Sequence, residues 1–250
     1  MGLSLSAAAF ANFQFMERAK RSAGYLAKLA VRYGSDKWGS HWYAPHYQTH
    51  FARFRWKRIT LLEIGIGGDS DVKAGGGSLR AWKSFFPRAK VVGVDLYDKS
   101  AHRQRRIRTY QGDQADATFL KNVVAQEGPP DIIVDDGSHI NEHVIRSFKT
   151  LFPLLKDGGI YAIEDTQTSY WPKYGGQLRN APNSAHPTLL EFFKQLTDGL
   201  NHAEFLEPDY AASYYDNHIV AMHFYHNLLF IYKGMNDEGS NCVRNGYLRC

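Results

Sequence analysis

The stretch DIIVDDGSHINEHVIRSFKTLFPLLKDGGIYAIED, residues 131–165, contains a strand, a helix and a second strand in close succession. DIIVDD and GGIYAIED are apolar runs that end in acids, without the alternation expected of a strand with one face in water. Such runs are typical of a parallel sheet covered on both faces. The segment between them, NEHVIRSFKTLFPLL, predicts the helix that connects two parallel strands. The stretch therefore predicts an α/β fold.

The same alternation of strands and helices continues on both sides of this stretch. Strands are predicted over residues 59–65, 90–97 and 106–112, and helices over residues 78–86, 115–128 and 186–200. Ser78 is in position to cap the first of these helices, and Gly128 ends the second before two prolines. Residues 217–234 predict an antiparallel hairpin that turns near His226–Asn227. We expect a doubly wound, mostly parallel sheet of seven strands with this hairpin at one edge.

The chain divides into three predicted parts. Residues 1–58 are expected to hold an N-terminal helix, over residues 12–33, and an aromatic segment over residues 33–51. That segment, YGSDKWGSHWYAPHYQTHF, shows neither strand nor clean helix periodicity and is interpreted as a packed lid. Residues 59–235 form the predicted core domain, and residues 236–250 form a C-terminal tail.

The composition is that of a soluble globular protein: 44% of the 250 residues are hydrophobic and 22% are charged. No apolar run reaches the length of a membrane span, and the N-terminus lacks a signal-peptide pattern. We therefore expect a cytoplasmic location, with Cys242 and Cys250 as free thiols. The net charge of +5 is mostly local, because HRQRRIR, residues 102–108, carries four arginines; we interpret this run as a solvated loop.

Acidic residues follow each of the five strands predicted to be parallel. They are Glu63, Asp95, Asp113, Asp135, Asp136, Glu164 and Asp165. Ligands of an open α/β sheet bind beyond the carboxyl ends of its strands. A single acid at a strand end is explained by a cap of the following loop, but acids at five strand ends predict a ligand site.

The first three strand ends predict a cofactor that carries a nucleoside. EIGIGG, residues 63–68, places Gly65 and Gly67 in a tight turn where the backbone can approach a ligand closely. Asp95 ends the second strand and can accept both hydroxyls of a ribose. Asp113, after the third strand, can reach an adenine edge.

The glycine turn resembles the acid-x-Gly-x-Gly motif of class I S-adenosylmethionine-dependent methyltransferases, with Glu63, Gly65 and Gly67 at the three motif positions. The sheet of that class also ends in an antiparallel hairpin. A nicotinamide enzyme is less similar, because position 70 is serine where its third glycine is expected. The resemblance implies that Glu63, the two glycines and Gln114 bind the cofactor.

The fourth and fifth strand ends predict a metal site. Asp135 and Asp136 are adjacent on a strand and therefore point to opposite faces. We assign Asp135 to the sulfonium and amine of the cofactor and Asp136 to the substrate side. Asp136, Glu164 and Asp165 would converge, and three carboxylates repel unless a hard cation neutralises them. Oxygen ligands without cysteine predict Mg²⁺ rather than Zn²⁺. Both Glu164 and Asp165 can bind it only if the strand breaks there.

Four motifs, DDGSH, EDTQTSYWPKYGG, LLEIGIGG and the aromatic segment, are together similar to bacterial sugar O-methyltransferases. That family methylates deoxysugars of macrolides and related glycosides, rhamnosides and mycobacterial mannosides. The resemblance covers residues 33–235 and implies that Asp136, Glu164 and Asp165 bind Mg²⁺ and that His139 is the general base. A vicinal diol of the sugar would complete the metal's ligands. Tyr170 and Trp171 suit stacking on the sugar.

Other functions stay open at this point. A catechol-type O-methyltransferase would also use neighbouring hydroxyls held by a metal. A nucleic-acid methyltransferase is suggested by the basic run, but DDGSH differs from the Pro-Pro-aromatic motif of base-methylating enzymes, and no appended RNA-binding module is visible. A relative recruited for antibiotic oxidation is a third alternative. We expect a glycoside substrate, no nucleic-acid or membrane partner, and a homo-oligomer.

Overall fold

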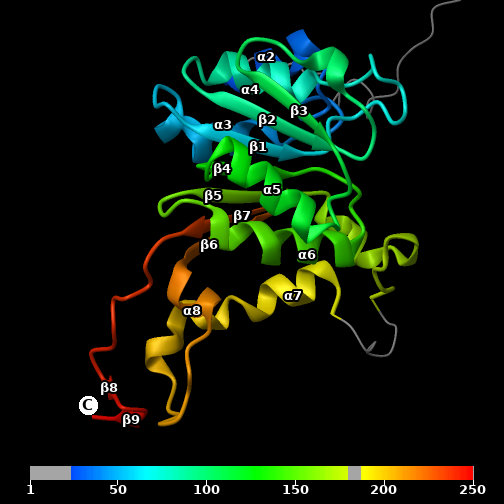
Figure 1. Ribbon diagram of the computed structural model, residues 1–250. Helices are drawn as coiled ribbons and strands as arrows, with labels where there is room; N and C mark the ends of the chain where they lie inside the picture. Colours follow the sequence, from blue (N-terminus) through cyan, green and yellow to red (C-terminus); the bar gives the residue numbers. More distant parts are fainter. Residues whose placement is uncertain (1–23, 180–186, 250) are drawn as a thin grey trace, which may run out of the picture.

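The structure is a computed structural model that describes residues 24–179 and 187–249. A seven-stranded sheet lies at its centre, in the order β3-β2-β1-β4-β5-β7-β6 (Figure 1). The strands are β1 Thr60–Ile64, β2 Lys90–Asp95, β3 Ile107–Gln111, β4 Ile132–Asp135, β5 Ile160–Glu164, β6 Ile219–Tyr225 and β7 Leu228–Lys233. Strands β1 to β5 pair in parallel, and β7 pairs antiparallel with β5 and β6. The predicted mostly parallel sheet with its antiparallel hairpin is confirmed.

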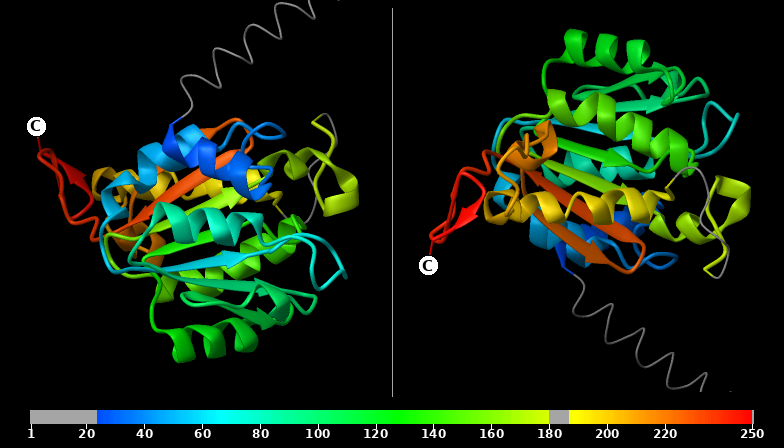
Figure 2. Two further views of the ribbon diagram at one scale, coloured as in Figure 1. Left: turned by 90° about the horizontal axis from the view of Figure 1, so that it is seen from above. Right: turned by 90° about the horizontal axis from the view of Figure 1, so that it is seen from below.

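Helices cover both faces of the sheet (Figure 2). One face carries α2 Tyr25–Tyr33, α3 Ala44–Phe51 and α4 Gly77–Phe85, and the other carries α5 Ala117–Glu127, α6 Asn141–Leu151 and α7 Leu189–Gln195. Successive strand residues alternate between the faces, so Leu61 packs with the first group and Leu62 with the second. This two-sided burial is why the strands are apolar without alternation.

Shorter elements complete the description. They are the helix α8 Tyr214–His218, the strands β8 Val243–Arg244 and β9 Tyr247–Leu248, and the 3-10 helices Ala52–Phe54, Ser100–His102, Phe152–Leu154, Thr166–Tyr170, Pro172–Tyr174 and Asp198–Glu204. The helix predicted over residues 186–200 is therefore shorter than expected. None of the described helices combines the length and the apolar character needed to cross a membrane.

The aromatic segment contains a helix that the prediction missed. Helix α3 spans Ala44–Phe51, and its Tyr47 and Phe51 are fully buried in the core against Trp82 and Phe230. Aromatic residues at positions 43, 47 and 51 have the four-residue spacing of one helix face. One face of this helix, with Ala44, Tyr47, His50 and Phe51, is therefore buried, while the lid interpretation of the segment stays a prediction.

The predicted N-terminal helix is present in part. Helix α2 begins at Tyr25, and residues 12–23 of the prediction lie outside the described residues. Helices α2 and α3 share one hydrophobic core with the sheet and with α4. The domain boundaries at residues 58 and 235 stay predictions.

The expected cap of α4 is also wrong. The helix begins at Gly77 after Gly76, whose φ is 68°, and no side chain caps it. Ser78 lies within the first turn and donates a hydrogen bond to Oε2 of Glu63 at 2.8 Å. Glu63 is fully buried, and a buried carboxylate needs donors. The serine hydroxyl therefore serves Glu63 and not the helix end.

The basic run is only partly a solvated loop. Arg103 donates to the carbonyl of Thr109, and Arg106 donates to the carbonyls of Lys83, Phe86 and Ala89. Two residues of the run belong to strand β3. Arg103 therefore binds strand β3, and Arg106 links the start of β3 to the end of α4 and the loop after it.

The tail forms the β8–β9 hairpin, which projects from the body of the molecule (Figure 1). Cys242, just before it, is disulfide-bonded, so the expectation of a free thiol is wrong for this residue. The hairpin brings Cys242 and Arg249 together, because the N–H of Arg249 donates to the carbonyl of Cys242 at 2.8 Å. Cys250 lies outside the described residues.

Candidate active site

The site lies where the strand order of the sheet reverses. Strands β1 and β4 are neighbours there, with Ile64 opposite Asp135, and the N–H of Asp136 donates to the carbonyl of Ile64 at 2.9 Å. Gly65 adopts a φ of 87°, and a Cβ on it would lie 2.0 Å from the carbonyl oxygen of Asp136. The glycine turn is therefore packed against the acid pair of β4, at the point where open α/β sheets bind ligands.

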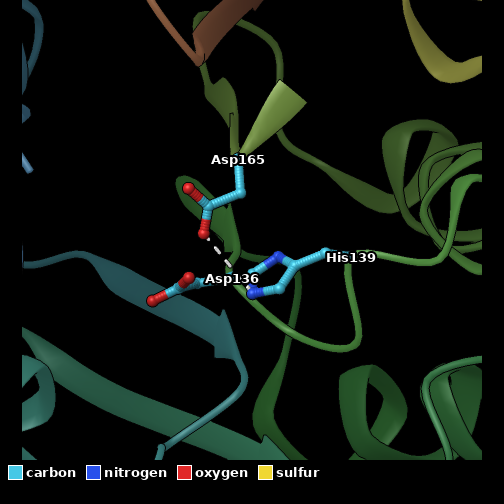
Figure 3. A group of neighbouring side chains, drawn as sticks. All are labelled: Asp136, His139 and Asp165. Atoms are coloured by element: carbon cyan, nitrogen blue, oxygen red, sulfur yellow. Dashed lines mark ion pairs between the residues drawn. The ribbon is translucent and has the colours of Figure 1, made fainter. Parts of the chain in front are cut away.

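Asp136, His139 and Asp165 come together beyond the ends of β4 and β5 (Figure 3). Each offers one ligand atom, and these atoms lie within 4.8 Å of one another. Strand β5 ends at Glu164, and Asp165 turns away with φ 54° and ψ 39°, so the break that the metal prediction required is present. His139 has a φ of 55°. Left-handed backbone is rare outside glycine and gathers at functional sites.

Asp165 holds the imidazole of His139. Its Oδ2 lies 3.4 Å from Nε2 of the ring, while its Oδ1 accepts hydrogen bonds from Tyr43 at 2.8 Å and from Gln167 at 2.9 Å. Burial raises the pKa of Asp165, but the hydrogen bond from Gln167 and the positive charge of His139 outweigh it, and the net shift is downward. Asp165 is therefore an anion suited to pair with a protonated histidine or a cation.

Lys37 is the functional residue that the sequence prediction missed. Its ammonium lies 2.6 Å from Oδ2 of Asp136, 2.6 Å from Oε1 of Glu164 and 3.5 Å from Oε1 of Glu63, and its side chain is 4% exposed. Tyr47 also donates to Oε1 of Glu164, at 2.6 Å. We expected a cation against these acids, and a lysine of the aromatic segment supplies one. The available signal was the one lysine in an aromatic segment, residues 33–51, that contains no arginine.

The predicted metal ligands are brought together incompletely. Asp136 and Asp165 belong to the group in Figure 3, with His139 in place of Glu164 as the third member. The structure places Glu164 beside Lys37, 3% exposed, and burial raises its pKa well above the ordinary value. Glu164 is adjacent to the group rather than part of it.

The donor set nevertheless fits a hard divalent cation. Lys37 and Tyr47 use only Oε1 of Glu164, and Lys37 uses only Oδ2 of Asp136. Among the described residues, none donates to the second oxygen of either carboxylate. With Asp165, these oxygens give the carboxylate-rich ligands that Mg²⁺ prefers.

The predicted cofactor residues occupy different depths. Asp95 is partly exposed at the end of β2, and its two oxygens accept from the N–H groups of Ile66 and Tyr97 at 2.8 and 2.9 Å. Asp113 is exposed, and its Oδ1 accepts from the N–H of Ala115 at 2.8 Å. Both acids therefore hold the turns around the predicted nucleoside site while reaching its surface.

Glu63 lies beneath the glycine turn. It has no exposed surface, and burial raises its pKa to about 7. Its contacts are Ser78 and Lys37, so it supports the turn from below rather than presenting an oxygen to solvent. Gly67, with a φ of 77°, remains on the turn itself.

Gln114 and Asp135 anchor the loop after β4 from inside the protein. The side-chain amide of Gln114 donates to Asp135 at 3.2 Å and to Ser147 at 3.1 Å. Its Oε1 accepts from the N–H of Ser138 at 2.6 Å. Asp135 also accepts from Tyr161 at 3.3 Å, is 1% exposed, and has a pKa that burial raises to about 7. The structure thus gives these two residues internal partners. Asp135 and Asp136 do face different partners, as predicted.

Of the two predicted substrate residues, only Tyr170 lines a hollow of the surface. Tyr170 is 46% exposed and lines a hollow of about 370 Å³. Trp171 is equally exposed but lies outside that lining, 5.9 Å from the ring of Tyr174. The hollow is bounded by Thr166, Gln167, Tyr170, Leu190, Lys194 and residues 224–227. Because Gln167 also bonds Asp165, the hollow adjoins the acid group.

Comparison with solved structures decides the fold family. The MycE methyltransferase of the mycinamycin pathway, in complex with Mg and SAH, superposes with a TM-score of 0.82 at 48% identity, covering 86% of this chain and 56% of the other. The chain has the class I methyltransferase fold. A second MycE structure, with Mg, SAH and mycinamycin VI, gives a TM-score of 0.81 at 47% identity, over 87% of this chain and 55% of that one.

Curated sequences agree with this fold. The chain is 49% identical over 216 residues to mycinamicin VI 2''-O-methyltransferase of Micromonospora griseorubida and to demethylmacrocin O-methyltransferase of Streptomyces fradiae. These matches cover 86% of this chain and 54% of each relative, so the chain spans about half the length of the curated relatives. No family model matches. The predicted resemblance to bacterial sugar O-methyltransferases is confirmed.

Proposed function

We propose that this chain is an S-adenosylmethionine- and Mg²⁺-dependent O-methyltransferase that acts on a hydroxyl of a glycoside sugar. The observation that carries the proposal is the group of Asp136, His139 and Asp165 beside the glycine turn, at the reversal of the sheet. The two relatives described above are named O-methyltransferases of mycinamicin VI and demethylmacrocin, a third is named 8-demethyl-8-alpha-L-rhamnosyl tetracenomycin-C 2'-O-methyltransferase, and MycE was crystallised with Mg and SAH.

The residues divide into a cofactor side and an acceptor side. Gly65, Gly67, Asp95 and Asp113 line the cofactor side, with Glu63, Gln114 and Asp135 supporting them from below. Asp136, Asp165 and the free oxygen of Glu164 would hold the metal. A bound Mg²⁺ would supply positive charge that orients neighbouring sugar hydroxyls and favours their ionisation.

His139 is the proposed general base. A sugar hydroxyl is a poor nucleophile near neutral pH, and an imidazole is suited to accept its proton there. As the oxygen attacks the methyl carbon, the bond between carbon and sulfur breaks, its electron pair stays on sulfur, and the hydroxyl proton passes to His139. Asp165, 3.4 Å from the ring, stabilises the imidazolium that results. Its two other hydrogen bonds keep it in place.

The hollow beside Tyr170 suits the remainder of the acceptor. Its walls combine aromatic and aliphatic side chains with a few polar groups, which is typical of small-molecule sites. Tyr170 can stack on a sugar face or an aglycone. Trp171 lies outside this hollow, and its stacking on the sugar stays a prediction. Homo-oligomerisation stays a prediction.

The function is tested with labelled S-adenosylmethionine and a panel of macrolide and rhamnosyl glycosides, assayed against simple diphenols. We expect transfer to glycosides, loss of turnover on chelation, and recovery with Mg²⁺. Full activity in excess chelator would remove the metal from the mechanism. Preferred transfer to diphenols would establish the catechol-type alternative instead.

A matched pair of acceptors tests the diol. One sugar carries a hydroxyl on the carbon next to the acceptor position, and its deoxy analogue lacks it. Two-point attachment stops rotation of the acceptor, so the analogue should lose about 10²-fold in kcat/KM. Equal kcat/KM for the pair would show that the neighbouring hydroxyl is not bound and that the acceptor is held by a single hydroxyl.

A further inference from the structure

Lys37 stands among the carboxylates of the site in a way that the mechanism above does not use. It lies within 3.5 Å of three of them, and the distances to Asp136 and Glu164 are both 2.6 Å. Its side chain is 4% exposed, so water does little to screen these charges. The ammonium therefore belongs to the electrostatics of the site.

Lys37 is outnumbered by the acids around it. Glu63, Asp136 and Glu164 lie within 3.5 Å of the one ammonium, and burial raises the pKa of all three acids. A divalent cation beside Asp136 and Glu164 would favour their ionised forms. The ammonium also binds one oxygen each of Asp136 and Glu164 and leaves the second oxygen of each available.

We propose that Lys37 is a built-in counterion that holds the metal-binding carboxylates together when no metal is bound and sets how strongly they attract one. It is a positioning residue and does not touch the reacting atoms. Without Lys37 the acids would repel one another and the apo site would open. With Mg²⁺ present, the metal would take over much of this neutralisation. The inference rests on the proposed metal site.

Lys233 provides a matched control. It is also buried, at 5% exposure, but its ammonium donates to the carbonyls of Pro153 and Leu155, at 2.9 and 2.7 Å. Its nearest acid is the exposed Asp157 at 4.0 Å. Replacing either lysine by methionine removes a buried ammonium of the same size. Only for the Lys37 change should the loss of stability relative to the wild type depend on Mg²⁺.

The experiment compares Lys37→Met, Lys233→Met and the wild type by thermal unfolding, in chelator and in saturating Mg²⁺, and by calorimetric Mg²⁺ titration of the folded proteins. We expect Lys37→Met to unfold several degrees lower in chelator and to regain most of the loss with Mg²⁺. Its Mg²⁺ affinity should rise by about tenfold or more, because the site gains a negative charge. Lys233→Met should lose stability equally in both buffers and keep the wild-type affinity.

The outcomes separate the inference from the proposed function. Binding of Mg²⁺ to the wild type with unchanged or weaker affinity in Lys37→Met overturns the role of Lys37 but keeps the metal site. Binding to Lys37→Met alone supports the role and shows that the ammonium occupies the site by itself. Absence of binding to both overturns the metal site and the inference together.

A milder change covers the case of poor folding. If Lys37→Met folds in neither buffer, the polar and neutral Lys37→Gln is taken through the same two measurements. A loss of stability in Lys37→Gln that is larger in chelator than in Mg²⁺ supports the inference, and equal losses in both buffers overturn it.

Discussion

The two ends of the central sheet use buried charge differently. At the amino ends, Lys233 donates to backbone carbonyls, and Asp131 accepts from the N–H of Thr60 at 2.8 Å and from Lys156 at 2.9 Å. At the carboxyl ends, Lys37 is shared by acids that keep further oxygens free. At the amino ends, hydrogen bonds to neighbouring groups satisfy the charges of Lys233 and Asp131. The arrangement at the carboxyl ends concentrates negative charge where a cation can bind.

Backbone conformation also differs between the two ends of β5, although Arg106, directly before β3, is left-handed as well, with a φ of 71°. His139 and Asp165 are both left-handed at the carboxyl ends without being glycine. Such residues cost free energy and persist where the surrounding contacts hold them. At the amino end the corresponding turn uses Gly158, with a φ of 75° and open space around it. Strain and unneutralised charge coincide at the end of the sheet where we place the chemistry.

The largest expected effect is on kcat, and it distinguishes a catalytic histidine from a structural one near the loop after β4. His139→Ala should lower kcat by about 10²-fold or more and leave cofactor affinity near normal, as expected when a general base is lost. His143→Ala is the control, because His143 contacts Ser138 of the same loop but lies outside the acid group. Steady-state kinetics and cofactor titration measure both. Collapse of cofactor binding in His139→Ala would make this histidine structural.

Glycine substitutions test the strain at the two ends. Gly65→Ala places a Cβ 2.0 Å from the carbonyl oxygen of Asp136 at a φ of 87°, whereas Gly158→Ala adds only the left-handed strain. We expect about 1 kcal/mol of destabilisation for Gly158→Ala and about 3 kcal/mol or more for Gly65→Ala. Denaturant unfolding measures both free energies. Similar losses would mean that the turn of Gly65 relaxes away from strand β4.

The hollow beside the acid group gives a smaller effect. Tyr170→Ala should raise KM for a glycoside by about tenfold, since the ring offers a large surface for stacking. Trp171→Ala, a change of similar size and exposure outside the hollow, should raise KM much less. The reverse order would move the substrate site to the outer rim.

The smallest effect lies away from both ends, on the face covered by α3. His50 bridges Tyr232 and Tyr225, with ring nitrogens 2.5 and 2.9 Å from the two hydroxyls, and burial lowers its pKa to about 4. His50 binds a proton below about pH 6.5 in the unfolded chain but only below about pH 4 in the folded chain. The contribution of neutral His50 to the free energy of unfolding is therefore complete above pH 6.5 and is lost as the pH falls from 6.5 to 4.

His50→Gln should flatten that part of the stability curve. Thermal unfolding of the variant and the wild type between pH 7 and pH 4 measures the difference. An unchanged slope in the variant would assign the acid sensitivity to other groups.

The order of elements was determined by the sequence. Continuous apolar strands between helices require a sheet buried on both faces, and the glycine turn and acids mark its carboxyl end. The sequence also predicted that Asp136, Glu164 and Asp165 converge, because ends of adjacent parallel strands meet at one edge. The structure brings Asp136 and Asp165 together, with His139 in place of Glu164. Local patterns contain this information, so residues 59–165 were predicted well. Helix α3 was missed although positions 43, 47 and 51 have helical spacing.

Only the tertiary structure decided which partner each acid receives. Lys37 is 99 residues from Asp136 and 127 from Glu164 along the chain, and no local pattern links them. The same holds for Ser78. Its local sequence predicted a helix cap, but in the folded protein its hydroxyl donates a hydrogen bond to Glu63. A buried charge must find a partner wherever the packing places one. The sequence thus determined where the acids gather, and the packing of distant segments determined which oxygens remain free.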